Sequence, residues 1–95
     1  MSYRWLEIDA NGNVYSGDKI FLKSTSSFTV TLPASPLTGV PISFIDGAGL
    51  CNINNITIAR NGKKIAGIEE DLTITENNAS FDLVYQGSDY GWVIR

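Results

Sequence analysis

The sequence contains no histidine, one cysteine and few charged residues, and each shortage excludes a class of chemistry. Without histidine the chain lacks the most common general base and the most common metal ligand. Cys51 has no second cysteine with which to form an intramolecular disulfide. No apolar run approaches the roughly 20 residues that a transmembrane helix needs. The start MSYRWLEID also lacks the basic and apolar regions of a signal peptide, so we expect none.

Length and composition predict a single globular domain. The chain has 95 residues, of which 43% are hydrophobic and 18% are charged. This length suits one thin-cored domain over residues 1–95 and is too short for two. The net charge is −3, and the seven basic residues are spread along the chain. This distribution argues against nucleic acid as the main ligand.

Alternation of apolar and polar residues dominates the sequence and predicts short strands. In the segment SFTVTLP, for example, Phe28, Val30 and Leu32 share one face. The same pattern, rich in threonine, isoleucine, valine and aromatic residues, recurs at regular intervals. The predicted strands are Tyr3–Ile8, Lys19–Lys23, Ser27–Leu32, Ile42–Asp46, Ile56–Arg60, a short Lys64–Ala66, Leu72–Thr75, Ser80–Gln86 and Tyr90–Arg95.

The turn residues between these segments favour antiparallel hairpins. Asn11-Gly12 and Asn61-Gly62 are typical of type I′ turns, in which both central residues have positive φ. We therefore predict an all-β fold of seven to nine short strands. A compact antiparallel β-sandwich, jelly-roll-like, and a small barrel both fit this pattern.

The polar motifs give no catalytic, cofactor-binding or metal-binding prediction. Glu69–Asp71 is the only acidic run, and a solvated loop explains it better than a carboxylate pair does. Asp9–Asn13 spaces its oxygens like part of a calcium loop, but no bidentate glutamate follows, and a tight turn explains it. Cys51 has no histidine to activate it, which predicts an unreactive thiol.

Four aromatic residues are the candidates for a binding surface. Trp5, Tyr85, Tyr90 and Trp92 could stack on a sugar or form a contact between subunits. Aromatic side chains are equally suited to a hydrophobic core, and that alternative stays open at this point.

From Ser27 to Arg95 the sequence resembles a β-module found in virion proteins of tailed bacteriophages. The order and spacing of several strand-and-turn segments carry this resemblance. They are FTVTLPASP (Phe28–Pro36), ISFIDGAG (Ile42–Gly49), NNITIARNGKKIAG (Asn54–Gly67), EDLTITENNASFDLVY (Glu70–Tyr85) and YGWVI (Tyr90–Ile94).

The resemblance implies a non-catalytic structural protein located in the virion and made in the cytoplasm of the host bacterium. Its role would be capsid decoration or part of a tail or neck appendage, and its partners would be other virion proteins. A homotrimer is expected, with Met1–Leu22 as a segment that anchors the module or exchanges a strand with a neighbour. We expect no partner membrane or nucleic acid and no cofactor. The alternative function is a tail-fibre module that binds host glycan.

Overall fold

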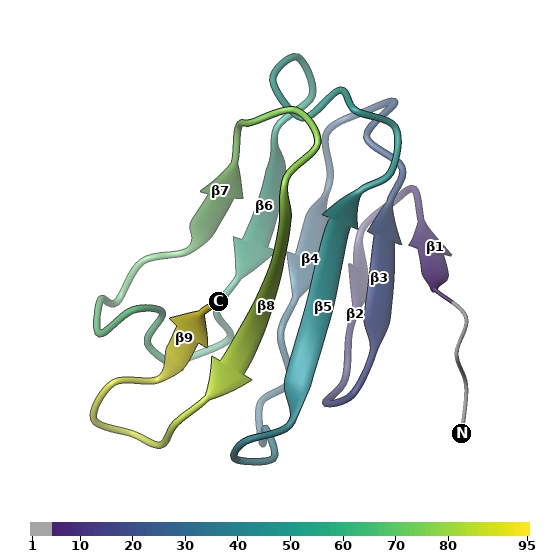
Figure 1. Ribbon diagram of the computed structural model, residues 1–95. Helices are drawn as coiled ribbons and strands as arrows, with labels where there is room; N and C mark the ends of the chain where they lie inside the picture. Colours follow the sequence, from purple (N-terminus) through teal and green to yellow (C-terminus); the bar gives the residue numbers. More distant parts are fainter. Residues whose placement is uncertain (1–4) are drawn as a thin grey trace.

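A computed structural model describes residues 5–95, and all of its regular structure within this range is β-strand (Figure 1). The all-β prediction is therefore confirmed. The strands are β1 (Leu6–Ile8), β2 (Gly12–Asn13), β3 (Lys19–Leu22), β4 (Thr29–Thr31), β5 (Pro41–Asp46), β6 (Ile56–Ala59), β7 (Leu72–Ile74), β8 (Ser80–Tyr85) and β9 (Trp92–Ile94).

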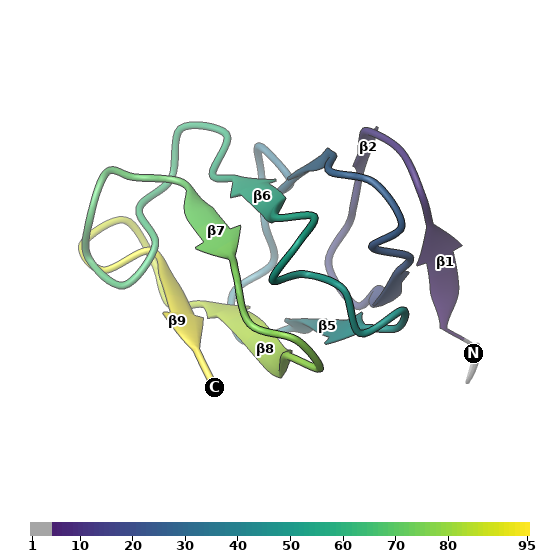
Figure 2. The same ribbon diagram turned by 90° about the horizontal axis from the view of Figure 1, so that it is seen from above.

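These strands form two sheets that lie face to face with the hydrophobic core between them (Figure 2). One sheet has five strands in the order β1-β3-β5-β8-β9, and the other has four in the order β2-β4-β6-β7. Both sheets are mixed. The strands β1 and β2 are outer strands on one side of the molecule, and β7 and β9 are outer strands on the other.

The predicted antiparallel arrangement is wrong for four of the seven strand pairs. From β1 to β6 the chain crosses to the opposite sheet after every strand. Each strand then pairs in parallel with the strand two places earlier, as in the register Ile20↔Phe44 of β3 and β5. Only β7, β8 and β9 add in antiparallel orientation. The chain from β1 to β6 therefore winds back and forth between the two sheets, and the antiparallel strands β7, β8 and β9 complete them.

Neither Asn-Gly pair forms the predicted hairpin. Asn61 and Gly62 have φ values of 51° and 85°, as a type I′ turn requires. The hairpin predicted there is nevertheless wrong, because β6 pairs with β4 and β7 and the chain after the turn pairs with Trp92. The hairpin predicted at Asn11-Gly12 is also wrong, because β1 and β2 lie in different sheets. Here the backbone N–H of Thr29 donates to Asn11 Oδ1 at 2.7 Å, so the asparagine fixes the crossing between the sheets.

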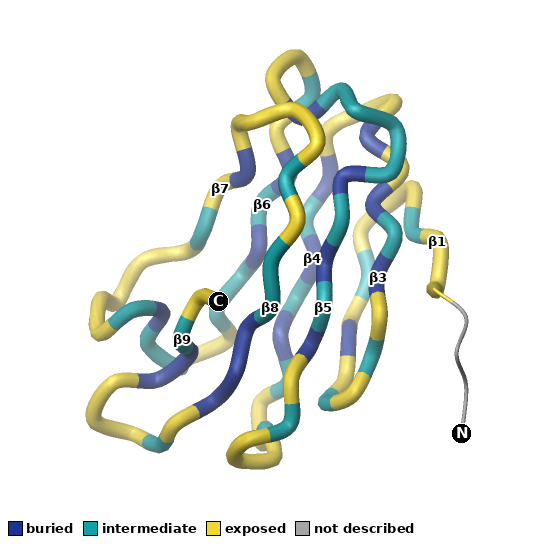
Figure 3. Tube along the Cα trace, in the orientation of Figure 1, coloured by how far each residue is buried: buried dark blue, intermediate teal, exposed yellow. Residues whose placement is uncertain are grey.

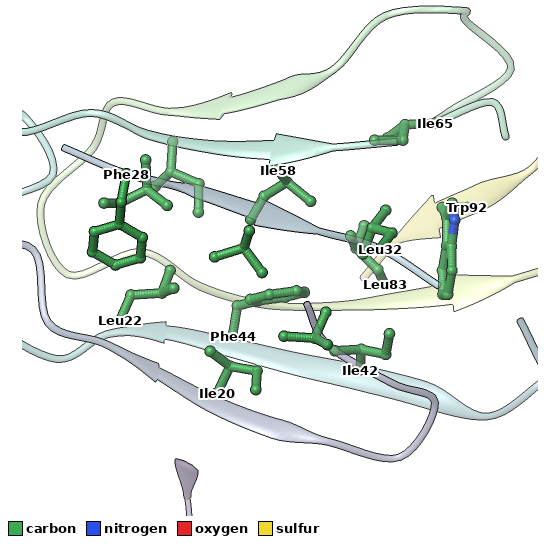
Figure 4. Close-up of a cluster of buried hydrophobic side chains, with 14 of the residues drawn as sticks. Ile20, Leu22, Phe28, Leu32, Ile42, Phe44, Ile58, Ile65, Leu83 and Trp92 are labelled. Atoms are coloured by element: carbon green, nitrogen blue, oxygen red, sulfur yellow. The ribbon is translucent and has the colours of Figure 1, made fainter. Parts of the chain in front are cut away.

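Both sheets contribute alternate side chains to one core (Figures 3 and 4). Phe28 and Leu22 lie at one end of this cluster, and Trp92 lies at the other, near Ile65. Phe44 and Phe81 stack with ring centroids 5.4 Å apart. Buried strand residues alternate with partly exposed ones along β3, β5 and β6, which is the period-two pattern read from the sequence.

Candidate functional site

A buried carboxylate at the end of β5 is the most connected polar group in the described part of the chain. Asp46 is 4% exposed and accepts hydrogen bonds from four other residues. The Ser24 hydroxyl donates to one carboxylate oxygen, and the backbone N–H of Gly49 donates to the same oxygen at 3.0 Å. The N–H groups of Cys51 and Asn78 donate to the other oxygen at 3.2 and 3.0 Å. One side chain thus holds three separate loops together.

The environment of Asp46 stabilises its charged form. Burial raises the pKa of the carboxyl, but the hydrogen bonds from Ser24, Asn78 and Cys51 outweigh burial and lower the pKa to about 2. The same burial, with the neighbouring negative charge of Asp46, raises the pKa of the Cys51 thiol to about 11. The thiol is therefore protonated at neutral pH, which agrees with the predicted unreactive cysteine.

The arrangement supports loop organisation rather than proton transfer. A carboxylate with a pKa of about 2 is a weak base, and its oxygens already accept hydrogen bonds. Ser24 is fully buried, donates to Asp46 and accepts the backbone N–H of Leu50 at 3.1 Å. Sequence analysis did not identify this cluster. The sequence feature that could have indicated it is the position of Asp46, an acidic residue at the end of an apolar strand and directly before the glycine-rich segment Gly47–Gly49.

The predicted acidic run lies in a solvent-exposed loop before β7, as expected for its structural interpretation. Within it, Asp71 accepts the backbone N–H of Arg60 at 2.9 Å and so links the loop to the end of β6. In residues 5–95 no three Asp, Glu, His or Cys side chains gather in a group that could hold a metal ion. The same range contains no helix that could cross a lipid bilayer.

The four candidate aromatic residues do not share one surface. Tyr85 and Trp92 pack edge to face in the core, with ring centroids 5.4 Å apart, and Trp92 is 0% exposed. Trp5 is 42% exposed beside β1, whereas Tyr90 is 51% exposed beside β9 at the opposite edge of the same sheet. Contact with a partner or a glycan stays a prediction, and Trp5 and Tyr90 are the rings accessible for it.

The buried indole of Trp92 has one unusual feature. Its Nε1–H has no hydrogen-bond acceptor among the residues that the structure describes. Leaving a buried donor unpaired costs about 1–3 kcal/mol. The ring's packing against Tyr85 and the rest of the core must offset this cost.

Two adjoining apolar hollows lie between the outer strands β7 and β9. One hollow has a volume of about 220 Å³ and is lined by the residues of β7 together with Phe81 and Ile94. A second hollow of about 160 Å³ lies beside Ile65 and Ile68 and shares Leu72 and Ile94 with the first. Sequence analysis did not predict this surface, because it depends on which strands become neighbours across the two sheets.

Comparison with known proteins adds no assignment: no protein-family model matches the chain, and a search of curated proteins finds no similar sequence.

Proposed function

We propose that this chain is a non-catalytic structural protein of a tailed-bacteriophage virion. In this proposal it is a small self-associating β-module that decorates or stabilises the particle, either on the capsid or on a tail or neck appendage. The resemblance of Ser27–Arg95 to phage modules supports the virion context. One structural observation supports self-association. In each sheet the parallel strands end at an outer strand, β1 or β2, with which no further strand of residues 5–95 pairs, and these two strands lie on the same side of the molecule.

The uncovered side is formed by β1 and β2. Within residues 5–95 no further strand pairs with the outer edge of either one. A free edge strand offers unpaired N–H and C=O groups to another chain. Both Leu6 in β1 and its neighbour Trp5 are exposed, and so is Tyr15, which follows β2. Exposed apolar side chains beside free strand edges favour association with another β-structured chain.

This geometry fits the expected anchoring role of Met1–Leu22. That segment contains β1, β2 and β3, and the part within residues 5–22 packs onto the module through parallel pairing of β2 with β4 and of β3 with β5. We interpret the two facing layers as an open sandwich, since a closed barrel would leave no outer strands. The parallel pairs depart from the antiparallel Greek keys of a jelly roll. A homotrimer, with the β1 and β2 edges at the contacts, completes the proposal.

The polar groups support a structural role. The most buried carboxylate organises loops, and the one thiol is protonated. We therefore propose that the chain is not an enzyme and that its partners are copies of itself and other virion proteins.

Mass spectrometry of purified phage particles tests this function. The particles should come from the bacterial strain whose resident phage encodes the chain, with free lysate protein analysed in parallel. We expect peptides of this chain in intact particles. The number of copies per particle, calibrated against the major capsid protein, should be a multiple of three. A chain found only in the free lysate fraction would overturn the proposal.

Glycan binding is the second candidate, because Trp5 and Tyr90 expose their rings. A glycan array probed with wild-type protein and with Tyr90→Ala tests it. Binding that the substitution abolishes would favour the tail-fibre alternative over a purely structural role.

A further inference from the structure

In the described part of the chain, the outer strand β7 has an edge that is open to pairing with another strand. It pairs with β6 on one side through the register Ile56↔Ile74, Thr57↔Thr73 and Ile58↔Leu72. No strand of the described chain pairs with its other side. Natural edge strands usually carry a charge or a proline that blocks further pairing, and the residues of β7, Leu-Thr-Ile, include neither.

An apolar groove lies directly beside this edge. We call the two adjoining hollows the β7 groove. Its apolar lining comes from both sheets and from the loop before β7, and includes Ile65, Ile68, Leu72, Ile74, Phe81 and Ile94. The groove faces the gap between the sheets, where a strand added to β7 would direct every second side chain, as Ile74 does.

The walls of the groove are held by contacts within the chain. Phe81 stacks on the core residue Phe44. On the β9 side, the N–H of Trp92 donates to the carbonyl of Lys64 at 2.8 Å, and the N–H of Ala66 donates to the carbonyl of Trp92 at 2.7 Å. These bonds cover part of the β9 edge and leave β7 as the free edge of the groove. A preformed groove lowers the cost of ordering when a ligand binds.

Charged residues along the groove are all acidic. Glu70 and Asp71 line one hollow, and Glu76 lines the other, while neither hollow has a lysine or arginine in its lining. A second copy paired β7 to β7 would bring two such acidic rims together, and the whole chain already carries a net charge of −3. Like charges placed opposite each other across paired strands are destabilising.

We propose that the β7 groove binds an extended segment of a different protein, which adds to β7 as a further strand. This segment has apolar side chains at alternate positions that enter the groove, and lysine or arginine beside them that faces Glu70 and Glu76. The β7 groove lies on the opposite side of the molecule from β1 and β2, so this inference is independent of self-association and of the virion assignment.

A peptide titration followed by NMR tests the proposal on the full chain. The probe is a synthetic heptapeptide with three valines alternating with two threonines and a lysine at each end. A matched peptide carries glutamate in place of both lysines. We expect the lysine peptide to shift the amide signals of Leu72–Thr75 and to bind at least about fivefold more tightly than the glutamate peptide at low salt.

Two pairs of variants locate the site. Ile94→Asp should weaken binding of the lysine peptide about tenfold or more, because Ile94 lines both hollows. Ile53→Asp is the matched control, since Ile53 is an exposed isoleucine that lines neither hollow. Glu76→Lys should weaken binding, whereas Glu7→Lys should leave it unchanged. The dispersion of the amide spectrum confirms that each variant is folded.

Three results of the experiments with peptide would overturn the inference. They are the absence of shifts in β7 at millimolar lysine peptide, equal affinity for the two peptides, and binding that Ile94→Asp and Ile53→Asp affect alike. Concentration-dependent shifts of Leu72–Thr75 without peptide would also overturn it, because they would identify a second copy as the occupant.

Discussion

At the scale of single residues, one carboxylate accepts the hydrogen bonds that hold three loops in place. Asp46 links the Ser24 loop, the turn through Gly49 and Cys51, and the segment before β8 that contains Asn78. Buried carboxylates are tolerated where several donors replace the lost water, as they do here. This cluster gives the loops at one end of the sheets a common polar anchor.

Asp46→Asn should lower the free energy of unfolding by about 1–3 kcal/mol at pH 7, since an amide cannot accept from all four donors. The pKa of Asp46 is lowered from 3.8 to about 2 on folding, so its ionised form stabilises the native state. That contribution is complete above about pH 4 and is lost as the pH falls towards 2. Urea unfolding measured between pH 2 and pH 7 checks both effects.

The exposed residue Asp89 provides the control. Asp89→Asn should leave the unfolding free energy nearly unchanged and keep the loss of stability between pH 4 and pH 2. An equal acid dependence in wild type and Asp46→Asn would contradict the role assigned to Asp46.

Trp92 tests how much the packing of one buried ring contributes to the stability of the core. Trp92→Ala should destabilise the fold by about 3–5 kcal/mol, because it removes a fully buried ring. Trp92→Phe leaves a smaller cavity and removes the unpaired Nε1–H, so its cost should be about 1–2 kcal/mol. Thermal and urea unfolding of both variants measure the difference. Equal losses for the two would contradict the packing role of the ring, because both variants lack Nε1–H and differ only in the cavity that they leave.

At the scale of elements, the positions of strands follow from local pattern, but their pairing does not. The alternation in Ile42–Asp46, Ile56–Arg60 and Ser80–Gln86 predicts β5, β6 and β8 nearly to the residue. The two-residue strand β2 has no apolar alternation and was missed. Parallel pairing depends on where the chain crosses between sheets, and turn residues such as Asn11-Gly12 carry no information about that.

The candidate site shows the same limit. An unreactive Cys51 could be predicted from the absence of activating residues, and its burial agrees with this. The partners of Asp46 could not be predicted, because Ser24 and Asn78 come from loops 22 and 32 residues away in the sequence. The β7 groove likewise arises only once β7 and β9 become the outer strands of facing sheets.

The contact between β9 and the loop before β7 rests on a glycine. Gly91 has a φ of +78°, and a Cβ there would lie 1.9 Å from the carbonyl oxygen of Lys64. Gly91→Ala should therefore break the pairing of Lys64–Ala66 with Trp92. Gly87→Ala is the matched control, since Gly87 also has positive φ but open space around it. We expect Gly91→Ala to lower the unfolding free energy at least about 1–2 kcal/mol more than Gly87→Ala does.

Amide hydrogen exchange localises the effect of Gly91→Ala. Protection of the Trp92 and Ala66 amides should fall in this variant and persist in Gly87→Ala. Retained protection of both amides in Gly91→Ala would show that the pairing of the loop with β9 does not depend on a glycine at this position.

At the scale of the whole molecule, the two sides differ in what they offer a partner. On one side, β1 and β2 have outer edges with which no other strand of residues 5–95 pairs, and Trp5 and Leu6 are exposed there. The β7 side presents an apolar groove with an acidic rim. We propose self-association through the first side and binding of a basic extended partner at the second. A structural module with two distinct contact surfaces can join its own copies to a different protein.

Leu6→Lys should disrupt self-association while leaving the fold intact, because Leu6 is exposed in the outer strand β1. The added charge would lie at the proposed contact and would have to lose its hydration there. Ile53→Lys places the same charge at an exposed isoleucine that belongs to neither β1 nor β2 and should leave the assembly unchanged.

The most direct test of the account is the mass of the purified protein in solution, measured by light scattering after size exclusion. Wild type and Ile53→Lys should have a mass near three times 10.4 kDa, and Leu6→Lys should have the mass of one chain. A wild-type protein that is monomeric from micromolar to millimolar concentration, or a trimer that Leu6→Lys does not weaken, would contradict self-association through the β1 and β2 edges.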